Sequence, residues 1–352
     1  MANKALAVDG LAEAVADKSV PDEEIGDPQM KAFMPIVPPI KPMPLSRLHV
    51  VVAAYVLAAF GLMASLPTAS AQKANERTFA TPGEAVLALY SAVKDNDQAA
   101  LSAIFGTNSG DVLHSGDEVA DKKAGQDFLQ RYEQMHRVVI EPDGTVTLYI
   151  GAENWPFPIS IVKNSSGTSY FDTESGKQEI LYRRIGINEN DAIEICYALV
   201  QSQRDYASAV RGGESSKHYA MKFLSDEGKQ NGLYWKTSGE EPPSPIGPLI
   251  ADATSQGYTN KAAPFHGYYF RILTKQGAAS KGGAKDYVVN GQLARGFAFV
   301  AYPAQYKNSG VMTFIVNQNG IVYQKDLGPD TQSIASAMTE YNPDDTWDPV
   351  DR

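Results

Sequence analysis

Apolar and polar positions follow a helical period first and a strand period afterwards in the stretch after residue 80. Thr81 is placed to cap a helix, with Pro82 at its first position and Glu84 as the acid of a capping box. Apolar residues at three- and four-residue steps then predict helices at 82–94, 98–105 and 118–137. The period changes to two beyond them, which predicts antiparallel strands at 138–140, 146–150, 157–162, 169–172 and 180–183.

The same order of patterns returns in the second half of the chain. Asn188 or Asn190 is expected to cap a helix that reaches about Val210, because apolar residues recur along it at helical spacing. Asn319-Gly320 predicts a tight hairpin between the last two strands. The alternating patterns predict strands at 268–274, 287–289, 296–302, 311–317 and 321–325.

Helices followed by strands in both halves predict an α+β fold with two domains, at 76–186 and 187–341. Each domain is expected to pack its helices on an antiparallel sheet. The acidic residues near the end of the chain predict a solvated tail at 342–352.

An apolar run at residues 50–66 is typical of the core of an export signal. Ala69 and Ala71 then supply the two small residues of a cleavage site that precedes Gln72. The sequence therefore predicts that residues 48–72 are a signal peptide and that the chain after them works outside the cytoplasm.

The residues before this run are unusual for a signal, because they are rich in proline and acidic side chains. Residues 1–47 are expected to be a disordered tail, or an upstream extension if translation starts at Met43. The alternative to cleavage is a membrane anchor through residues 48–66, since the run is at the lower length limit of a spanning helix. In both cases the protein is expected to be exported, as a periplasmic or secreted protein or one anchored to the inner membrane.

The composition limits the classes of function. With 352 residues and 43% hydrophobic content, the chain can bury a core of ordinary size. Its formal net charge is −10 and no basic run interrupts it, which excludes a nucleic-acid partner. Cys196 is the single cysteine, so no intrachain disulfide can form. Its place on the apolar stripe of a helix predicts a buried, unreactive thiol.

Two short motifs resemble those of penicillin-recognising serine enzymes. Ser160 and Lys163 match S-x-x-K, and Lys236 begins a K-T-S-G segment. That chemistry needs the serine at the start of a buried helix, whereas Ser160 lies in a strand pattern, where positions three apart face opposite sides. We therefore interpret both motifs as chance matches, with Lys236 in a surface turn.

The acidic loop before the third helix has the composition of a cation site. Asp111, His114, Asp117 and Glu118 lie close together in it. A solvated loop that leads into a helix accounts for them equally well, and no histidine pair has the spacing of metal ligands. The sequence therefore predicts no metal and no cofactor.

Aromatic residues are dense in the strands of the second half, and a sheet puts alternate residues on opposite faces. One face is expected to pack against the helix, and the other against the first domain or, alternatively, as an aromatic platform for a ligand. The side chains best placed to bind a small ligand are His266, Tyr268, Arg271 and Asp286.

Three resemblances to known families add expectations. The segments EEPPSPIGPLIADA and DYVVNGQLARGFAFVAYPAQYKNSGVMTFIVNQNGIVYQKDLGPDT resemble domain-of-unknown-function family 2950, from about residue 80 to residue 350. That resemblance implies an exported bacterial protein and supplies no catalytic residues. Residues 76–186 resemble the NTF2-like superfamily, which implies a curved sheet with a cavity. The later helix, strands and hairpin look like the globular part of type IV pilins, without the prepilin cleavage motif.

The sequence thus favours a non-catalytic envelope protein that binds another envelope protein or a small ligand. One alternative is an envelope hydrolase acting on cell wall or carbohydrate, with His266, Arg271 and Asp286 as its polar cluster. Such an enzyme should bring at least two of these side chains within hydrogen-bonding distance. The other alternative is a pilin-like accessory protein.

Overall fold

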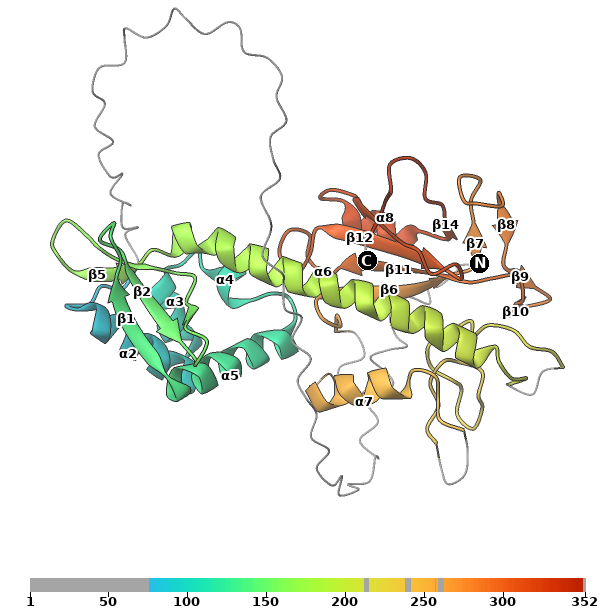
Figure 1. Cartoon of the computed structure of the whole chain (residues 1–352), viewed down its shortest axis with the longest axis horizontal. Helices are drawn as coiled ribbons and strands as arrows, with labels where there is room; N and C mark the ends of the chain where they lie inside the picture. The colour runs from blue at the N-terminus through green and yellow to red at the C-terminus, as the bar shows by residue number, and fades with distance from the viewer. Residues whose placement is uncertain (1–75, 212–214, 238–241, 257, 259–262, 351–352) are drawn as a thin grey trace, which may run out of the picture. The chain divides into compact units, whose positions relative to one another are not determined.

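The computed structural model describes residues 76–211, 215–237, 242–256, 258 and 263–350, which all belong to one compact unit (Figure 1). These residues form helices and mainly antiparallel sheets, which confirms the α+β prediction. The expected tail at 1–47 and the apolar segment at 48–72 lie outside the described residues. Among the helices that are described, none combines the length and the apolar character needed to cross a membrane.

Helices α2 and α3 begin and end where the sequence predicts, whereas the helix predicted at 118–137 ends at Gln134, before strand β1. Thr81 caps helix α2, because its hydroxyl accepts a hydrogen bond from the backbone N–H of Glu84 at 3.2 Å, and the Glu84 carboxylate accepts one from Ala80 N at the same distance. Asp97 caps the next helix in the same way. The helices of this part are α2 (Pro82–Lys94), α3 (Gln98–Phe105), α4 (Gly110–Leu113) and α5 (Glu118–Gln134).

The helices α2, α3 and α5 cover one face of a sheet with the order β1-β2-β4-β5, and β3 adds to β2. The core between them contains Leu89, Ile104, Leu148, Ile161 and Phe171, all almost fully buried. The strands are β1 (His136–Ile140), β2 (Val146–Ile150), β3 (Trp155–Pro156), β4 (Ile161–Lys163) and β5 (Ser169–Phe171).

A single 34-residue helix, α6 (Thr173–Tyr206), follows the first sheet. The strand predicted at 180–183 is therefore wrong, and so is the helix start at Asn188 or Asn190. The expected domain boundary between residues 186 and 187 falls inside α6. Asp172 caps the helix by accepting a hydrogen bond from Ser175 N at 3.3 Å. The segment Ile180-Leu181-Tyr182 has a composition typical of a strand. No proline interrupts residues 173–206, so the helix continues through this segment.

The second sheet has the order β15-β13-β12-β11-β6, and its long strands lie within two residues of the predicted positions. Helix α6 contacts its three central strands. The strand predicted at 287–289 forms a separate small hairpin instead. The five strands of the sheet are β6 (Tyr268–Leu273), β11 (Ala298–Pro303), β12 (Met312–Asn317), β13 (Val322–Asp326) and β15 (Asp348–Pro349).

Shorter elements surround this sheet. The expected solvated tail takes part in the fold, because β15 pairs with β13 and Trp347 is buried. The shorter elements are α7 (Gly247–Gln256), α8 (Thr331–Ala337), β7 (Lys275–Gln276), β8 (Lys285–Asp286), β9 (Val288–Val289), β10 (Gln292–Leu293) and β14 (Glu340–Tyr341).

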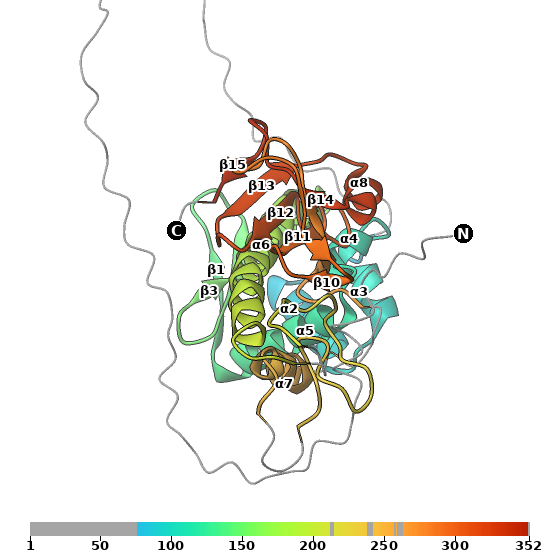
Figure 2. The same cartoon turned by 90° about the vertical axis from the view of Figure 1, so that its right-hand side faces the viewer.

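Both faces of the second sheet are covered. All six residues of β11 are buried, although alternate residues point to opposite faces. Helices α6 and α8 both contact β11, and Figure 2 shows them on opposite sides of the sheet. The expectation that the aromatic residues pack is confirmed, and α8 packs on the second face. The fully or almost fully buried aromatic residues are Tyr268, Phe270, Tyr287, Phe297, Phe299 and Tyr302.

Candidate functional site

Strand β1 is fastened at both of its ends. At its start, the ring of His136 stacks on the ring of Tyr132 with centroids 3.9 Å apart. At its end lies a turn, which the sequence Pro142-Asp143-Gly144 favours. In this turn Asp143 Oδ1 accepts hydrogen bonds from the backbone N–H and the hydroxyl of Thr145 at 2.9 and 2.8 Å. These bonds hold the pKa of Asp143 below its ordinary value. Gly144 completes the turn with φ +86°.

The outer edge of β1 is exposed along the whole strand. It is the last strand of its sheet, and among the described residues no other strand pairs with it on that side. Val139 is half-buried and the other four residues are exposed. Val138 and Ile140 expose 40% and 76% of their surface. An exposed edge with apolar side chains is a template on which another polypeptide can add a strand.

The other sheet edges are protected in ways that β1 is not. At β5, Phe79 exchanges two backbone hydrogen bonds with Ser169, each of 2.8 Å, and so closes that edge. Strand β6 has no fully exposed residue. Strand β15 has only two residues, and Pro349 is one of them. Of the edges in the two five-stranded sheets described here, β1 is therefore the long and open one.

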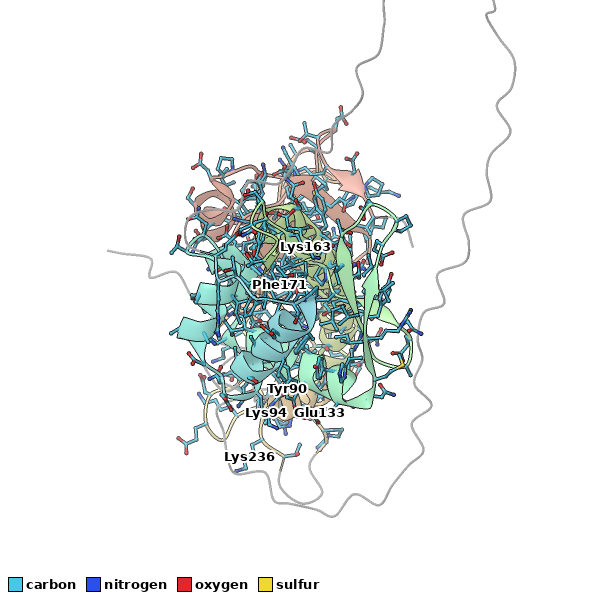
Figure 3. The ribbon with its side chains drawn as sticks, turned by 90° about the vertical axis from the view of Figure 1, so that its left-hand side faces the viewer. Tyr90, Lys94, Glu133, Lys163, Phe171 and Lys236 are labelled. Carbon is cyan, nitrogen blue, oxygen red and sulfur yellow. The ribbon has the colours of Figure 1, made fainter. Side chains whose placement is uncertain are left out.

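A chain of hydrogen bonds ties α2 to α5, the helix that leads into β1. The Tyr90 hydroxyl donates to Glu133 Oε1 at 2.8 Å and accepts from Lys94 Nζ at 3.3 Å. Figure 3 shows these three side chains together at one end of the structure. The hydrogen bond that Lys94 donates to the Tyr90 hydroxyl raises the pKa of the exposed Lys94. Tyr90 also stacks on Tyr132 with a centroid distance of 4.6 Å, so the contacts extend to the start of β1.

A second candidate is a buried polar network around Asp117, which is only 1% exposed. Its Oδ1 caps α5 by accepting hydrogen bonds from Val119 N and Ala120 N at 3.1 and 3.0 Å. Its Oδ2 accepts from the Tyr258 hydroxyl at 2.9 Å and from Gly267 N at 3.1 Å. Burial raises the pKa of Tyr258 far above its ordinary value, and the Asp117 charge adds to the effect. Each carboxylate oxygen has two donors, so the network is a structural cross-link.

His266 and Tyr268, two of the predicted ligand-binding residues, have partners inside the chain. His266 Nδ1 lies 2.8 Å from Asp191 Oδ2. The Tyr268 side chain is fully buried, and its hydroxyl donates to Met312 O at 2.9 Å. Burial raises the pKa of Tyr268. Both side chains therefore stabilise the second sheet.

Arg271 and Asp286, the other two predicted residues, lie at separate places. Arg271 Nη1 donates to Ala335 O and Met338 O at 2.8 and 3.1 Å, which satisfies carbonyl groups at the end of α8. Asp286 is exposed and accepts a hydrogen bond from Val288 N at 2.9 Å. Within the described residues, no hydrogen bond or ion pair joins any two of the four predicted residues. Ligand binding by them stays a prediction.

The two serine-enzyme motifs are not brought together. Ser160 directly precedes β4, and Lys163 ends that strand, so the serine is not at the start of a helix. Figure 3 shows Lys163 and Lys236 far apart. The arrangement that an S-x-x-K enzyme needs is therefore not formed by these residues.

The acidic loop also has a structural role. Asp111 Oδ2 forms an ion pair with Lys177 Nζ at 2.5 Å. Arg184 donates to Asp111 O and Val112 O at 2.8 and 3.0 Å and to Asn308 Oδ1 at 2.5 Å, so it ties α6 to α4 and to the loop after β11. Burial lowers the pKa of Arg184. Across the described part of the chain, no group of three or more His, Cys, Asp or Glu side chains is arranged to hold a metal ion.

Sequence reasoning did not identify the β1 edge or the Asp117 network. The signal for β1 was available: Val138, Val139 and Ile140 are consecutive apolar residues that lead into a tight turn, without a lysine or a bulge to protect them. For Asp117, the N-cap position before Glu118 was visible, but its bond to Gly267, 150 positions away, was not.

In the part of the chain that the structure describes, the fold and these sites define an α+β protein with two hydrophobic cores and an open sheet edge at β1. The chain belongs to the family described as "Protein of unknown function (DUF2950)", which matches residues 76–350. This confirms the resemblance stated from the sequence, whereas the likenesses to the NTF2-like superfamily and to type IV pilins are not confirmed. Neither the curated proteins nor the solved structures give a significant match.

Proposed function

We propose that this protein is an exported, non-catalytic envelope protein that binds a partner polypeptide by adding a strand at β1. The observation that carries the proposal is the open edge of β1, with Val138 and Ile140 exposed beside unpaired backbone groups. In strand addition, backbone hydrogen bonds supply affinity, and side chains on alternate positions supply specificity. Covering the exposed apolar side chains of such an edge removes apolar surface from water, which contributes favourable free energy to binding.

The surroundings of β1 support binding rather than aggregation. The contacts of His136 and of the turn at Asp143 hold the strand in an extended form before a partner arrives. A strand that is already ordered loses little conformational entropy when it pairs. The favourable free energy of binding is therefore little reduced by the cost of ordering the strand. The exposed, charged Arg137 limits indiscriminate pairing.

The contacts of the predicted polar residues support a role without catalysis. The His266 ring, the Tyr268 hydroxyl and the Arg271 guanidinium each bond to a group of the chain itself. Catalysis needs polar groups that converge on a substrate in a shared site, and among the described residues no hydrogen bond or ion pair joins any two of these three side chains. The export signal at 48–72 supports a place of action in the envelope.

The test is site-specific photo-cross-linking in the cells that make the protein. A photoreactive phenylalanine derivative at Ile140 is expected to give covalent adducts with a partner polypeptide. The same residue at Ile321, which is also exposed at 49% but lies outside β1, is the matched control and is expected to give none. Adducts that are absent from position 140, or equally abundant at both positions, would contradict the proposal.

Export is tested separately by mass spectrometry of the chain purified from the same cells. A chain that begins at Gln72 is the expected result, because Ala69 and Ala71 form the cleavage site. A chain recovered from the cytosol with residues 48–72 intact would exclude the envelope role and leave the binding edge to be judged by cross-linking alone.

A further inference from the structure

Within the described residues, Arg271 forms hydrogen bonds through one guanidinium nitrogen only. Nη1 donates to Ala335 O and Met338 O at 2.8 and 3.1 Å. Nε is buried and has no acceptor, and no hydrogen bond or ion pair in the described part of the chain uses Nη2. The N–H groups of Nε and Nη2 lie parallel on one side of a guanidinium group. Arg271 therefore presents a fork of two parallel donors to a partner other than the described residues.

The register of the second sheet places three hydroxyl-bearing residues around Arg271. Strands β6 and β11 pair Tyr269 with Tyr302. The register of β11 on β12, continued by one residue, places Thr313 on the other side of Tyr302. Arg271 lies two residues after Tyr269 on β6 and therefore points to the same face of the sheet, which α8 covers. Tyr269, Arg271, Tyr302 and Thr313 are thus neighbours on one face of three adjacent strands, and we call them the Arg271 cluster.

The hydroxyl groups of the Arg271 cluster are unpaired as well. Thr313 is 0% exposed, and its Oγ1 has no hydrogen-bond partner among the residues that the structure describes. Tyr302 is only 3% exposed, and neither its hydroxyl nor that of Tyr269 takes part in a hydrogen bond with a described residue. Buried polar atoms are almost always paired, because an unpaired one keeps the cost of leaving water. Several unpaired donors on one patch of a sheet indicate a polar ligand.

The electrostatics of the Arg271 cluster favour an anion. Burial raises the pKa of Tyr302, and the nearby positive charge of Arg271 opposes part of that rise. Burial raises the pKa of Tyr269 too. Both phenols therefore keep their protons and can donate hydrogen bonds. The Arg271 cluster thus offers one positive charge and three hydroxyl groups, and Arg271 forms no ion pair with any acidic residue that the structure describes.

We propose that the Arg271 cluster binds the carboxylate group of a small molecule, with Nε and Nη2 of Arg271 as a bidentate fork and the hydroxyls of Tyr302 and Thr313 as further donors. The fork matches the two oxygens of a carboxylate. One negative charge balances the single charge of Arg271, whereas a doubly charged phosphate would carry uncompensated charge into a mainly buried site. Arg271 and Tyr269 are half-buried on the edge strand β6, so the ligand enters from that side.

The experiment is saturation-transfer NMR on the chain as purified from the producing cells, with acetate as the probe. Saturation of the protein protons reaches the methyl group of acetate only while acetate is bound. We expect a methyl signal that formate suppresses, because formate carries the same carboxylate group. Chloride at equal ionic strength and inorganic phosphate should leave the signal in place. Absence of the signal, or suppression by chloride or phosphate as strong as by formate, would overturn the proposal of a carboxylate site.

Three substitutions locate the binding. Arg271→Lys keeps the charge and a donor for the α8 carbonyls but removes the fork. Tyr302→Phe and Thr313→Val each remove one unpaired hydroxyl. Each variant should weaken the binding of acetate by about tenfold or more, because each removes a hydrogen bond to a charged group. Ser169→Ala is the matched control: it removes a buried, unpaired hydroxyl from the first sheet and should bind acetate as the unchanged chain does.

Urea unfolding in carboxylate-free buffer separates lost binding from lost folding. Thr313→Val replaces an unpaired buried hydroxyl by a methyl group of similar size, so its free energy of unfolding should equal or exceed that of the unchanged chain. A clear loss of stability would show that the hydroxyl is already paired within the chain and would overturn the site. Equal acetate signals from the unchanged chain and Arg271→Lys would overturn it as well. All these variants leave β1 intact, so the outcome is independent of the proposed strand addition.

Discussion

Two glycines of α6 give opposite expectations for the same substitution. At Gly186 an added Cβ would meet no atom within 4 Å, whereas at Gly176 it would lie 2.7 Å from Ile159 Cγ1 and 2.8 Å from both Ile159 Cα and Pro158 O. The second position has no room, because two of these atoms belong to the backbone.

The free energies follow from these distances. Alanine in the interior of a helix is more stable than glycine by roughly 0.5–1 kcal/mol, so Gly186→Ala should raise the free energy of unfolding by about that amount. Gly176→Ala gains the same propensity but must displace a packed backbone, which costs about 1–3 kcal/mol. We expect a net loss of up to about 2.5 kcal/mol for Gly176→Ala.

The assay is urea-induced unfolding of the two variants and the unchanged chain, monitored by circular dichroism at 222 nm. The free energies can be compared if the three chains show the same dependence of the unfolding free energy on urea concentration. If Gly186→Ala lowers the urea concentration at the midpoint of unfolding, residue 186 is not inside a helix. The strand predicted at 180–183 and the domain boundary predicted after residue 186 would then be supported again. If Gly176→Ala raises it, the approach of α6 to Pro158 and Ile159 is wrong.

Two further predictions concern buried groups. Tyr258→Phe should lower the free energy of unfolding by about 1.5–3 kcal/mol, because it leaves a lone pair of the buried Asp117 unsatisfied. Tyr306→Phe is the control, because it removes an exposed hydrogen bond from a tyrosine hydroxyl to the carboxylate of Asp326. An equally large loss for Tyr306→Phe in urea unfolding would refute the reasoning. Cys196 should resist thiol reagents until the chain unfolds, because burial raises its pKa to about 12. The folded chain then keeps a proton that the unfolded chain releases above its ordinary value of 9.0, so stability measured by unfolding should fall as the pH rises from 9 toward 12.

The sequence determined the features that depend on a few neighbouring residues. The cap at Thr81 and the turn at Asp143 each need a side chain to reach a backbone group within three positions. The four long strands of the second sheet followed from alternation alone, and the family followed from segments of continuous sequence. These signals are local, so no knowledge of the fold was needed to interpret them.

The tertiary structure decided which helices and strands cover which faces and edges of the sheets. The continuity of α6 through residues 180–190 was hidden because the strand-like composition there is overridden by contacts with α4 and the second sheet. The Asp117 cross-link joins groups up to 150 positions apart, and α8, which packs on β11, comes after β13 in sequence. The openness of β1 is of the same kind: alternation predicts a strand, but only the order of strands in the sheet places that strand at an uncovered edge.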